Sequence, residues 1–331
     1  MLAALSAALA AMLGIPLWSA SATGAGSLAV TGYVEQGSAA AVIDRSAPAL
    51  STVGVDGVNL DRTGGAVTAV DGSARSLLQR AHTDGLRGEL LFGNYDNAIG
   101  DFSPRIAADL LHSARNIRVV AAQLTTITTS QGWNGVTVDL ESLDGTDRAG
   151  LVHFVTALRA DLPVGRSLSI DVGAATSLSD YAASGFDLTR LGHVVDRVVL
   201  MAYDQHGPWS QPGPIGAIDW QRQSLAVLLT RVSAAKVDLG VAGYGYTWPK
   251  GSALHHGTSL SDAQARQLTG RAVARTRWVK ASGEWTATLN NGTILWWSDA
   301  RSYRLRLALA RRFSLHGVAV WQLASSDPLV Q

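Results

Sequence analysis

The sequence has 331 residues, with 27 Lys and Arg, 26 Asp and Glu, and a formal net charge of +1. An apolar fraction of 47% with only 16% charged residues excludes a disordered chain and provides for a large buried core. The absence of cysteine excludes disulfides, thiolate metal sites and thiol nucleophiles, so stability must come from packing.

Residues 1–22 are predicted to be a signal peptide. Residues 2–17 are almost entirely apolar, and Ala20-Ser21-Ala22 supplies the small side chains that suit cleavage before Thr23. No basic residue precedes the apolar run, which departs from the usual signal pattern, and the run is too short for a spanning helix. We therefore expect a secreted or cell-wall-associated protein without stable membrane insertion.

Eight short runs rich in β-branched residues follow, separated by longer stretches with helical spacing. In the clearest helix, apolar residues recur at offsets of three, four, seven and eleven from Leu151, and the pattern stops at Pro163. Buried parallel strands that alternate with helices predict an α/β fold, a (β/α)8 TIM barrel within residues 23–331. The eight runs are residues 28–34, 52–58, 89–92, 135–140, 167–172, 197–203, 237–243 and 317–323.

The gap between the seventh and eighth runs is too long for one helix. Residues 278–289 hold a Ser282-Gly283 turn between alternating residues, and residues 292–297 form another strand-like run. We predict a small α+β insertion at about 249–297 and a return helix at 302–313. An insertion after strand seven would stand beside the C-terminal face of the barrel, where active sites of this fold lie.

The fourth run carries two acids near its end. Because strand side chains alternate with a period of two, Thr137, Asp139 and Glu141 share one face of the run. The apolar face opposite suits the helix layer, so both carboxylates are predicted to point into the barrel. Two like charges in a partly desolvated site raise at least one pKa, as a general acid requires at neutral pH.

Two other runs are predicted to complete this site. The sixth run places Met201 and Tyr203 inward and Asp204 at the rim, and the parity of the eighth run places Trp321 inside the barrel. An aromatic floor beneath two acids suits a sugar ring, whose C–H bonds pack on an aromatic face.

The position of the two acids restricts the mechanism. Glycosidases ordinarily place carboxylates on both sides of the scissile bond, but Asp139 and Glu141 share one strand and one face. The attacking group is then either another carboxylate, such as Asp204, or the 2-acetamido group of the substrate. In the second case Asp139 would steady the cationic intermediate, Tyr203 would hydrogen-bond the acetamide oxygen and Glu141 would protonate the leaving oxygen.

These segments resemble glycoside hydrolase family 18, the chitinase-like barrels, and most resemble its bacterial spore-cortex-lytic and cell-wall branch. The family signature D-G-x-D-x-D-x-E appears as residues 134–141 with its last two acids retained, and M-x-Y-D matches residues 201–204. The strand-eight tryptophan matches Trp321, and residues 239–248 resemble the Y-G-x-x-W ending of strand seven. The resemblance covers nearly all of residues 27–328, and its four motifs stand in the family order.

The resemblance implies specific roles and also shows departures. Thr137 and Asn134 stand where the family pattern has acids. Because the family acid at the position of Thr137 exchanges a hydrogen bond with the middle aspartate, reorientation of Asp139 is expected to be slower or differently timed. The third-strand S-x-G-G pattern is not evident at residues 92–95. The implied catalytic residues are Glu141, Asp139 and Tyr203, and the implied substrate-binding residues are Trp321, Met201, Asp204, Tyr244 and Asn94.

Three hypotheses follow. The first is an exported hydrolase of β-1,4-linked N-acetylglucosamine glycans in peptidoglycan or chitin-type oligomers, retaining, monomeric, and without metal or cofactor. The second is a non-catalytic, lectin-like barrel, because Thr137 and Asn134 replace acids. The third is a metal-dependent hydrolase that uses Asp139, Glu141 and Asp204. No basic-aromatic motif points to a nucleic-acid partner.

Charge is unevenly distributed along the chain. From Lys250 onward, eleven Lys and Arg stand against four Asp and Glu, a charge of +7, so the preceding part carries −6. This split suits contact of the C-terminal part with an anionic polymer, and it equally fits a solvated arginine-rich surface.

Overall fold

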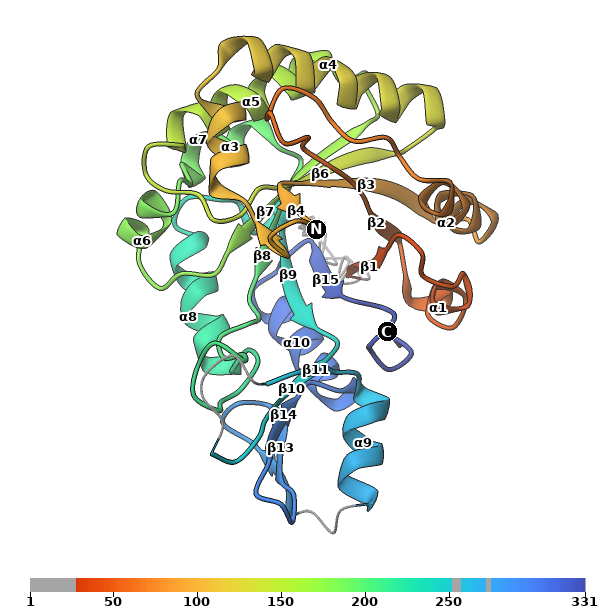
Figure 1. The fold of residues 1–331 in the computed structure, drawn as a ribbon, viewed down its shortest axis with the longest axis vertical. Coiled ribbons are helices and arrows are strands. Elements are labelled where there is room, and N and C mark those ends of the chain that lie inside the picture. Colours follow the sequence, from red (N-terminus) through yellow and green to blue (C-terminus); the bar gives the residue numbers. More distant parts are fainter. Residues whose placement is uncertain (1–27, 252–256, 272–274, 331) are drawn as a thin grey trace, which may run out of the picture.

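The computed structural model describes residues 28–251, 257–271 and 275–330, and its centre is a closed barrel of eight parallel strands (Figure 1). The predicted TIM barrel is confirmed, and each predicted run overlaps one strand. In hydrogen-bonded order the strands are β1 (Ala29–Glu35), β15 (Gly317–Trp321), β9 (Val237–Ala242), β8 (Arg197–Met201), β7 (Ser167–Gly173), β6 (Gly135–Asp139), β3 (Arg87–Gly93) and β2 (Thr52–Asn59).

Helices cover the outside of the barrel. The predicted helix from Leu151 is α5, which begins after Asp147 and ends before Pro163, with Leu151 and Leu158 fully buried. The predicted return helix is α10. The helices of this layer are α1 (Ala41–Asp44), α2 (Gly72–Thr83), α3 (Pro104–Leu111), α4 (Ala114–Gln131), α5 (Arg148–Asp161), α6 (Leu178–Ala183), α7 (Leu188–Val194), α8 (Ile218–Leu228) and α10 (Ala300–Arg312), with 3-10 turns η1 (Ala47–Ala49) and η2 (Ala234–Lys236).

Strand alternation separates the core from the barrel interior. On β6, Val136 and Val138 are fully buried in the main hydrophobic core, whereas Thr137 and Asp139 belong to the inward face. Nearer the N-terminal ends of the strands, Arg197 forms an ion pair with the buried Glu89.

A five-stranded antiparallel sheet and one helix form the insertion between β9 and β15, below the barrel in Figure 1. The Ser282-Gly283 turn joins two of its strands as predicted. Its sheet already starts at Gly245, because residues 245–248 pair with β14. The elements are β10 (Gly245–Trp248), β11 (Ser259–Leu260), α9 (Asp262–Arg271), β12 (Arg275–Val279), β13 (Glu284–Thr288) and β14 (Ile294–Trp297).

A small hairpin of β4 (Tyr95–Asp96) and β5 (Asp101–Phe102) follows β3 at the barrel mouth. Within the described residues, no helix has the length and apolar character needed to cross a bilayer. The predicted signal peptide, residues 1–22, lies outside the described residues.

Candidate active site

Two acids meet at the C-terminal end of β6. Asp139 is 6% exposed, and its Oδ1 has no hydrogen-bond partner in the described structure. Burial, together with the charges of Glu141 and Asp171, raises the pKa of Asp139 well above its usual range. Burial and the charges of Asp204 and Asp101 raise the pKa of Glu141 to about 7. Glu141 can therefore hold a proton near neutral pH and release it in a reaction, as a general acid must.

Asn94 holds the backbone of the acid in place from the end of β3. Its Oδ1 accepts from the Glu141 backbone N–H at 2.9 Å, and its Nδ2 donates to the Glu141 carbonyl at 3.0 Å and to the Ser103 carbonyl at 3.0 Å. Asn94 has no exposed surface. It was predicted to bind substrate, but its buried amide faces the protein backbone, which places Asn94 behind Glu141 as a positioning residue.

The barrel interior contributes a third acid and a phenol that the motifs do not identify. Asp171 on β7 is 4% exposed, and burial together with the charge of Glu141 raises its pKa. Tyr33 on β1 is 2% exposed, and burial together with the charges of Asp171 and Glu89 raises its pKa well above the usual range. The alternation of β1 and β7 is the signal that places both residues inward, and Asp171 is level with Asp139 because Val138 pairs with Ile170.

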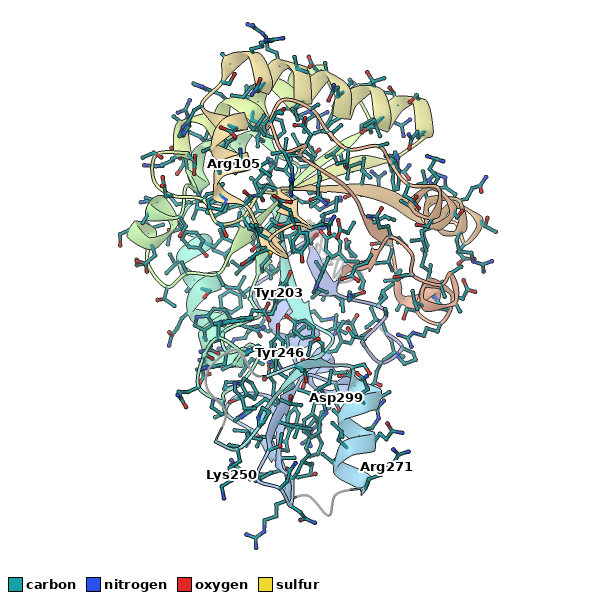
Figure 2. The ribbon with its side chains drawn as sticks, viewed as in Figure 1. Arg105, Tyr203, Tyr246, Lys250, Arg271 and Asp299 are labelled. Atoms are coloured by element: carbon teal, nitrogen blue, oxygen red, sulfur yellow. The ribbon has the colours of Figure 1, made fainter. Side chains whose placement is uncertain are left out.

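The loop after β8 carries the predicted Tyr203 and Asp204. Oδ1 of Asp204 accepts hydrogen bonds from the hydroxyls of Tyr244 at 2.5 Å and Tyr246 at 2.9 Å. Burial raises the pKa of Asp204, and these two hydrogen bonds lower it in part. Burial and the charges of the neighbouring acids keep the pKa of Tyr203 far above neutrality, so its hydroxyl remains a donor. Figure 2 shows Tyr203 and Tyr246 where the barrel meets the insertion.

Trp321 ends β15 inside the barrel mouth, as strand parity predicts. Its ring centroid lies 5.8 Å from that of Tyr33, and it packs in an aromatic cluster with Tyr203 and Tyr244. Met201, the last residue of β8, is half-buried. A cavity of about 670 Å³ opens beside this cluster, and its lining includes Glu35, Asp204, Tyr244, Tyr246, Trp321 and Gln322.

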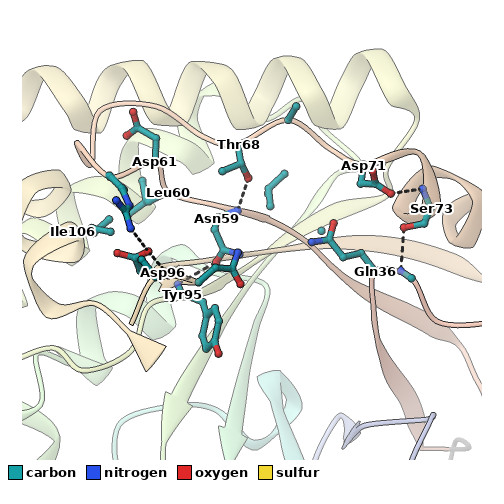
Figure 3. Close-up of a pocket in the computed structure, with 17 residues that line it drawn as sticks. Gln36, Asn59, Leu60, Asp61, Thr68, Asp71, Ser73, Tyr95, Asp96 and Ile106 are labelled. Atoms are coloured by element: carbon teal, nitrogen blue, oxygen red, sulfur yellow. Dashed lines mark hydrogen bonds and ion pairs between the residues drawn. The ribbon is translucent and has the colours of Figure 1, made fainter. Parts of the chain in front are cut away.

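A second cavity, of about 920 Å³, lies beside the ends of β1 and β2 and the strand β4 (Figure 3). Gln36 and Asn59 line it with amide groups, and Tyr95 adds a partly exposed ring. Tyr95 belongs to the same hairpin as Asp101, whose charge acts on Glu141. Two acids in different places therefore help to raise the pKa of Glu141. Asp101 belongs to the hairpin beside this cavity, and Asp204 lines the other cavity.

The two positions that depart from the family pattern have structural partners. Asn134 lies at the far end of β6 from the acids, where its Oδ1 accepts from the Gly88 backbone N–H at 2.7 Å and contacts His82 Nε2 at 2.9 Å. Thr137 faces Tyr33 inside the barrel. Asn134 therefore joins strand to helix layer, and only Thr137 lies near the reacting groups.

The chain is similar to known proteins in sequence and in fold. The family model described as Glycosyl hydrolases family 18 matches residues 75–327. The "Uncharacterized glycosylase YvbX" of Bacillus subtilis (strain 168) is 25% identical over 246 residues, which cover 72% of this chain and 71% of that protein. The "Cortical fragment-lytic enzyme" of the same organism is 25% identical over 296 residues, 86% of this chain and 67% of that protein. The crystal structure of a chitinase from Chromobacterium violaceum ATCC 12472 matches with a TM-score of 0.82 and 28% identity, over 91% of this chain and 95% of that one.

Proposed function

Because the chain belongs to glycosyl hydrolase family 18 and is a glycoside hydrolase, we propose that it cleaves β-1,4-linked N-acetylglucosamine glycans of the peptidoglycan or chitin type. The observation that carries the proposal is the pairing of Asp139 and Glu141 on one strand end, with the pKa of both acids raised. Such a pair supplies a proton donor and a neighbouring acid without bracketing the sugar, which favours a nucleophile from the substrate.

In the proposed reaction the 2-acetamido oxygen of the bound sugar attacks its own anomeric carbon. Glu141 gives its proton to the leaving glycosidic oxygen as that bond breaks, and Asp139 stabilises the positive charge on the acetamido nitrogen. Tyr203 donates a hydrogen bond to the acetamide oxygen and orients it. Glu141, now a carboxylate, takes a proton from the water that opens the cyclic intermediate, so the product keeps the original anomeric configuration.

Asp204 is the other carboxylate that could attack the sugar, and its contacts favour an anchoring role. One of its oxygens already accepts from both Tyr244 and Tyr246. Burial also raises the pKa of Asp204, which lowers the fraction present as a nucleophilic carboxylate. The substrate's own acetamido group meets neither obstacle.

We further propose that the enzyme acts outside the cell, at the cell wall. The predicted leader of residues 1–22 supports export, and the similarity to a cortical fragment-lytic enzyme supports a wall glycan as substrate.

The test compares the wild type with Glu141→Gln on chitohexaose and on purified peptidoglycan. Turnover should fall about a hundredfold or more, because a general acid is lost. Asp180→Asn, which neutralises an exposed carboxyl on α6, serves as the control and should leave turnover unchanged. NMR of the first product should show retention. Inversion would contradict substrate assistance, and undiminished turnover of Glu141→Gln would contradict the assigned acid.

The same measurements address the lectin-like alternative. Calorimetry on the wild type with an N-acetylglucosamine oligomer would then show binding, while long incubation gives no product. The raised pKa of Glu141 instead favours catalysis, because a binding barrel has no need of a poised acid.

A further inference from the structure

The insertion sheet carries a row of residues that leads away from the active site. Tyr246 on β10 lies directly opposite Trp296 on β14, Trp296 opposite Thr286 on β13, and Thr286 opposite Arg277 on β12. Directly opposed residues project from the same face of an antiparallel sheet. One face of the insertion therefore runs from a tyrosine bonded to Asp204, through a tryptophan and a threonine, to an arginine.

A parallel row on the same face ends in a second arginine. Ile294 lies opposite Thr288, and Thr288 lies opposite Arg275. The reverse face of the sheet is occupied, since Leu295 and Trp297 pack there in a cluster with Ala265 of α9. The face with the arginines instead borders a cavity of about 620 Å³, whose lining includes Pro212, Arg275, Arg277, Thr286, Thr288 and Trp296. We call the sheet face that carries Arg275, Arg277, Thr286, Thr288 and Trp296 the arginine face.

Both arginines of this face are exposed, and within residues 28–251, 257–271 and 275–330 neither has a side-chain partner. Neither Arg275 nor Arg277 forms an ion pair or a side-chain hydrogen bond with any described residue. Elsewhere on the insertion Arg266 pairs with Asp327 and, at its junction with α10, Arg306 pairs with Glu284. Two like charges two residues apart on one strand repel each other, so an anion bridging them is favoured.

The arginine face lies a few strand spacings from the tyrosine that contacts Asp204. Adjacent strands lie about 4.8 Å apart, so Arg277, three strands from Tyr246, lies roughly 14 Å away along the row. Tyr246 lines the cavity at Asp204 at one end of the row, and Trp296 and Arg277 line the cavity of about 620 Å³ at the other end.

We propose that the arginine face binds carboxylates on a peptidoglycan strand, from its lactyl groups or its peptides, while Trp296 packs against a sugar ring. The inference rests on the proposed function and narrows it: the preferred substrate is the acidic wall glycan, and neutral chitin lacks the group that the arginines recognise. The excess of basic residues after Lys250 is consistent with this assignment.

The test measures binding, so that it does not depend on turnover. The parent is the full chain with Glu141→Gln, and the variant adds Arg275→Gln and Arg277→Gln. Each is titrated onto purified peptidoglycan stripped of phosphate polymers, and onto the same material with its carboxyls amidated. We expect the parent to prefer the native material about fivefold at low ionic strength, and the variant to lose that preference, as two exposed charge contacts would give.

A matched control replaces two exposed arginines on α10, Arg304→Gln and Arg312→Gln, which remove the same charge and should keep the preference. Equal loss in this control would overturn the proposal, because net charge alone would then explain binding. A preference retained by the arginine-face variant would overturn it as well, and so would an arginine-dependent preference seen only for walls that still carry phosphate. If the preference behaves as expected but wild-type enzyme releases no product, the catalytic proposal fails and this one stands.

Discussion

The side chain of Asn94 and the backbone of Glu141 form a reciprocal pair of hydrogen bonds, with the amide oxygen accepting at 2.9 Å and the amide nitrogen donating at 3.0 Å. The two hydrogen bonds join Asn94, the residue after β3, to Glu141, which lies two residues after the end of β6. Because Asn94 is fully buried, no water competes for these bonds. The proposed acid is thus held by a side chain that has no exposed surface.

Replacing Asn94 by alanine should lower kcat more than it raises KM. The substitution leaves the Glu141 backbone N–H and carbonyl without their partner, so the acid loses its position, and the unfolding free energy should fall by about 1–3 kcal/mol. Steady-state kinetics and urea unfolding measure the two effects. Asn94→Asp sets a buried carboxylate against the carbonyls of Ser103 and Glu141, so it should impair kcat at least as much as alanine does. Unchanged kcat in Asn94→Ala would show that the pair has no positioning role.

Replacing Asp204 by asparagine should move the alkaline limb of the pH profile to lower pH. The protonated form of Glu141 is the active acid, so the rate falls as pH rises through its pKa of about 7. The charge of Asp204 helps to raise that pKa, and removing the charge lowers it. The profile of kcat/KM against pH gives the shift. Asp180→Asn, on the exposed α6 surface, should leave the limb in place, and a limb that moves upward in Asp204→Asn would contradict the assignment.

Breaking the buried pair of Arg306 and Glu284 should strongly destabilise the fold. Both side chains are 1% exposed, their nearest atoms are 3.2 Å apart, and Glu284 also accepts from the backbone N–H groups of Ile215 and Gly216. Arg306→Met leaves an unpaired buried carboxylate and should cost about 3–5 kcal/mol in urea unfolding. The double variant Arg306→Met with Glu284→Leu should cost less than the sum of the single losses, and strict additivity would contradict the pairing.

Replacing Asp262 by asparagine should stabilise the protein at alkaline pH. Asp262 is 1% exposed, and burial raises its pKa to about 8, against about 4 in an unfolded chain. The native state therefore retains a proton that the unfolded state loses, and this group's contribution to the unfolding free energy decreases as pH rises from about 4 to about 8. In the wild type the Asp327 backbone N–H donates a hydrogen bond to Asp262 Oδ2 at 2.9 Å. Asparagine keeps an oxygen that can accept this bond.

Urea unfolding of wild type and Asp262→Asn at pH 5 and pH 8 measures this difference. The stability of the variant relative to wild type should increase between the two values. A constant difference would show that Asp262 does not titrate as its burial requires.

Much of the site follows from patterns within single strands. Asp139 and Glu141 lie two residues apart, so their shared inward direction depends only on the backbone of β6 and the residue after it. Trp321 is assigned to the interior by the same alternation. Contacts between distant segments cannot be predicted in this way. The hydrogen bond from Tyr246 to Asp204 joins residues 42 positions apart, and no local sequence pattern predicts it.

The sequence alone determined the eight strands, the parity that turns two acids and a tryptophan inward, and the existence of an insertion after strand seven. These properties arise from hydrophobic periodicity, which each segment carries by itself. The tertiary structure decided that Asn94 supports Glu141, that Tyr33 and Asp171 lie near the acids, and that Trp296 and Arg277 share one row. Those relationships depend on the register between strands and on burial, which emerge only when distant segments pair and exclude water.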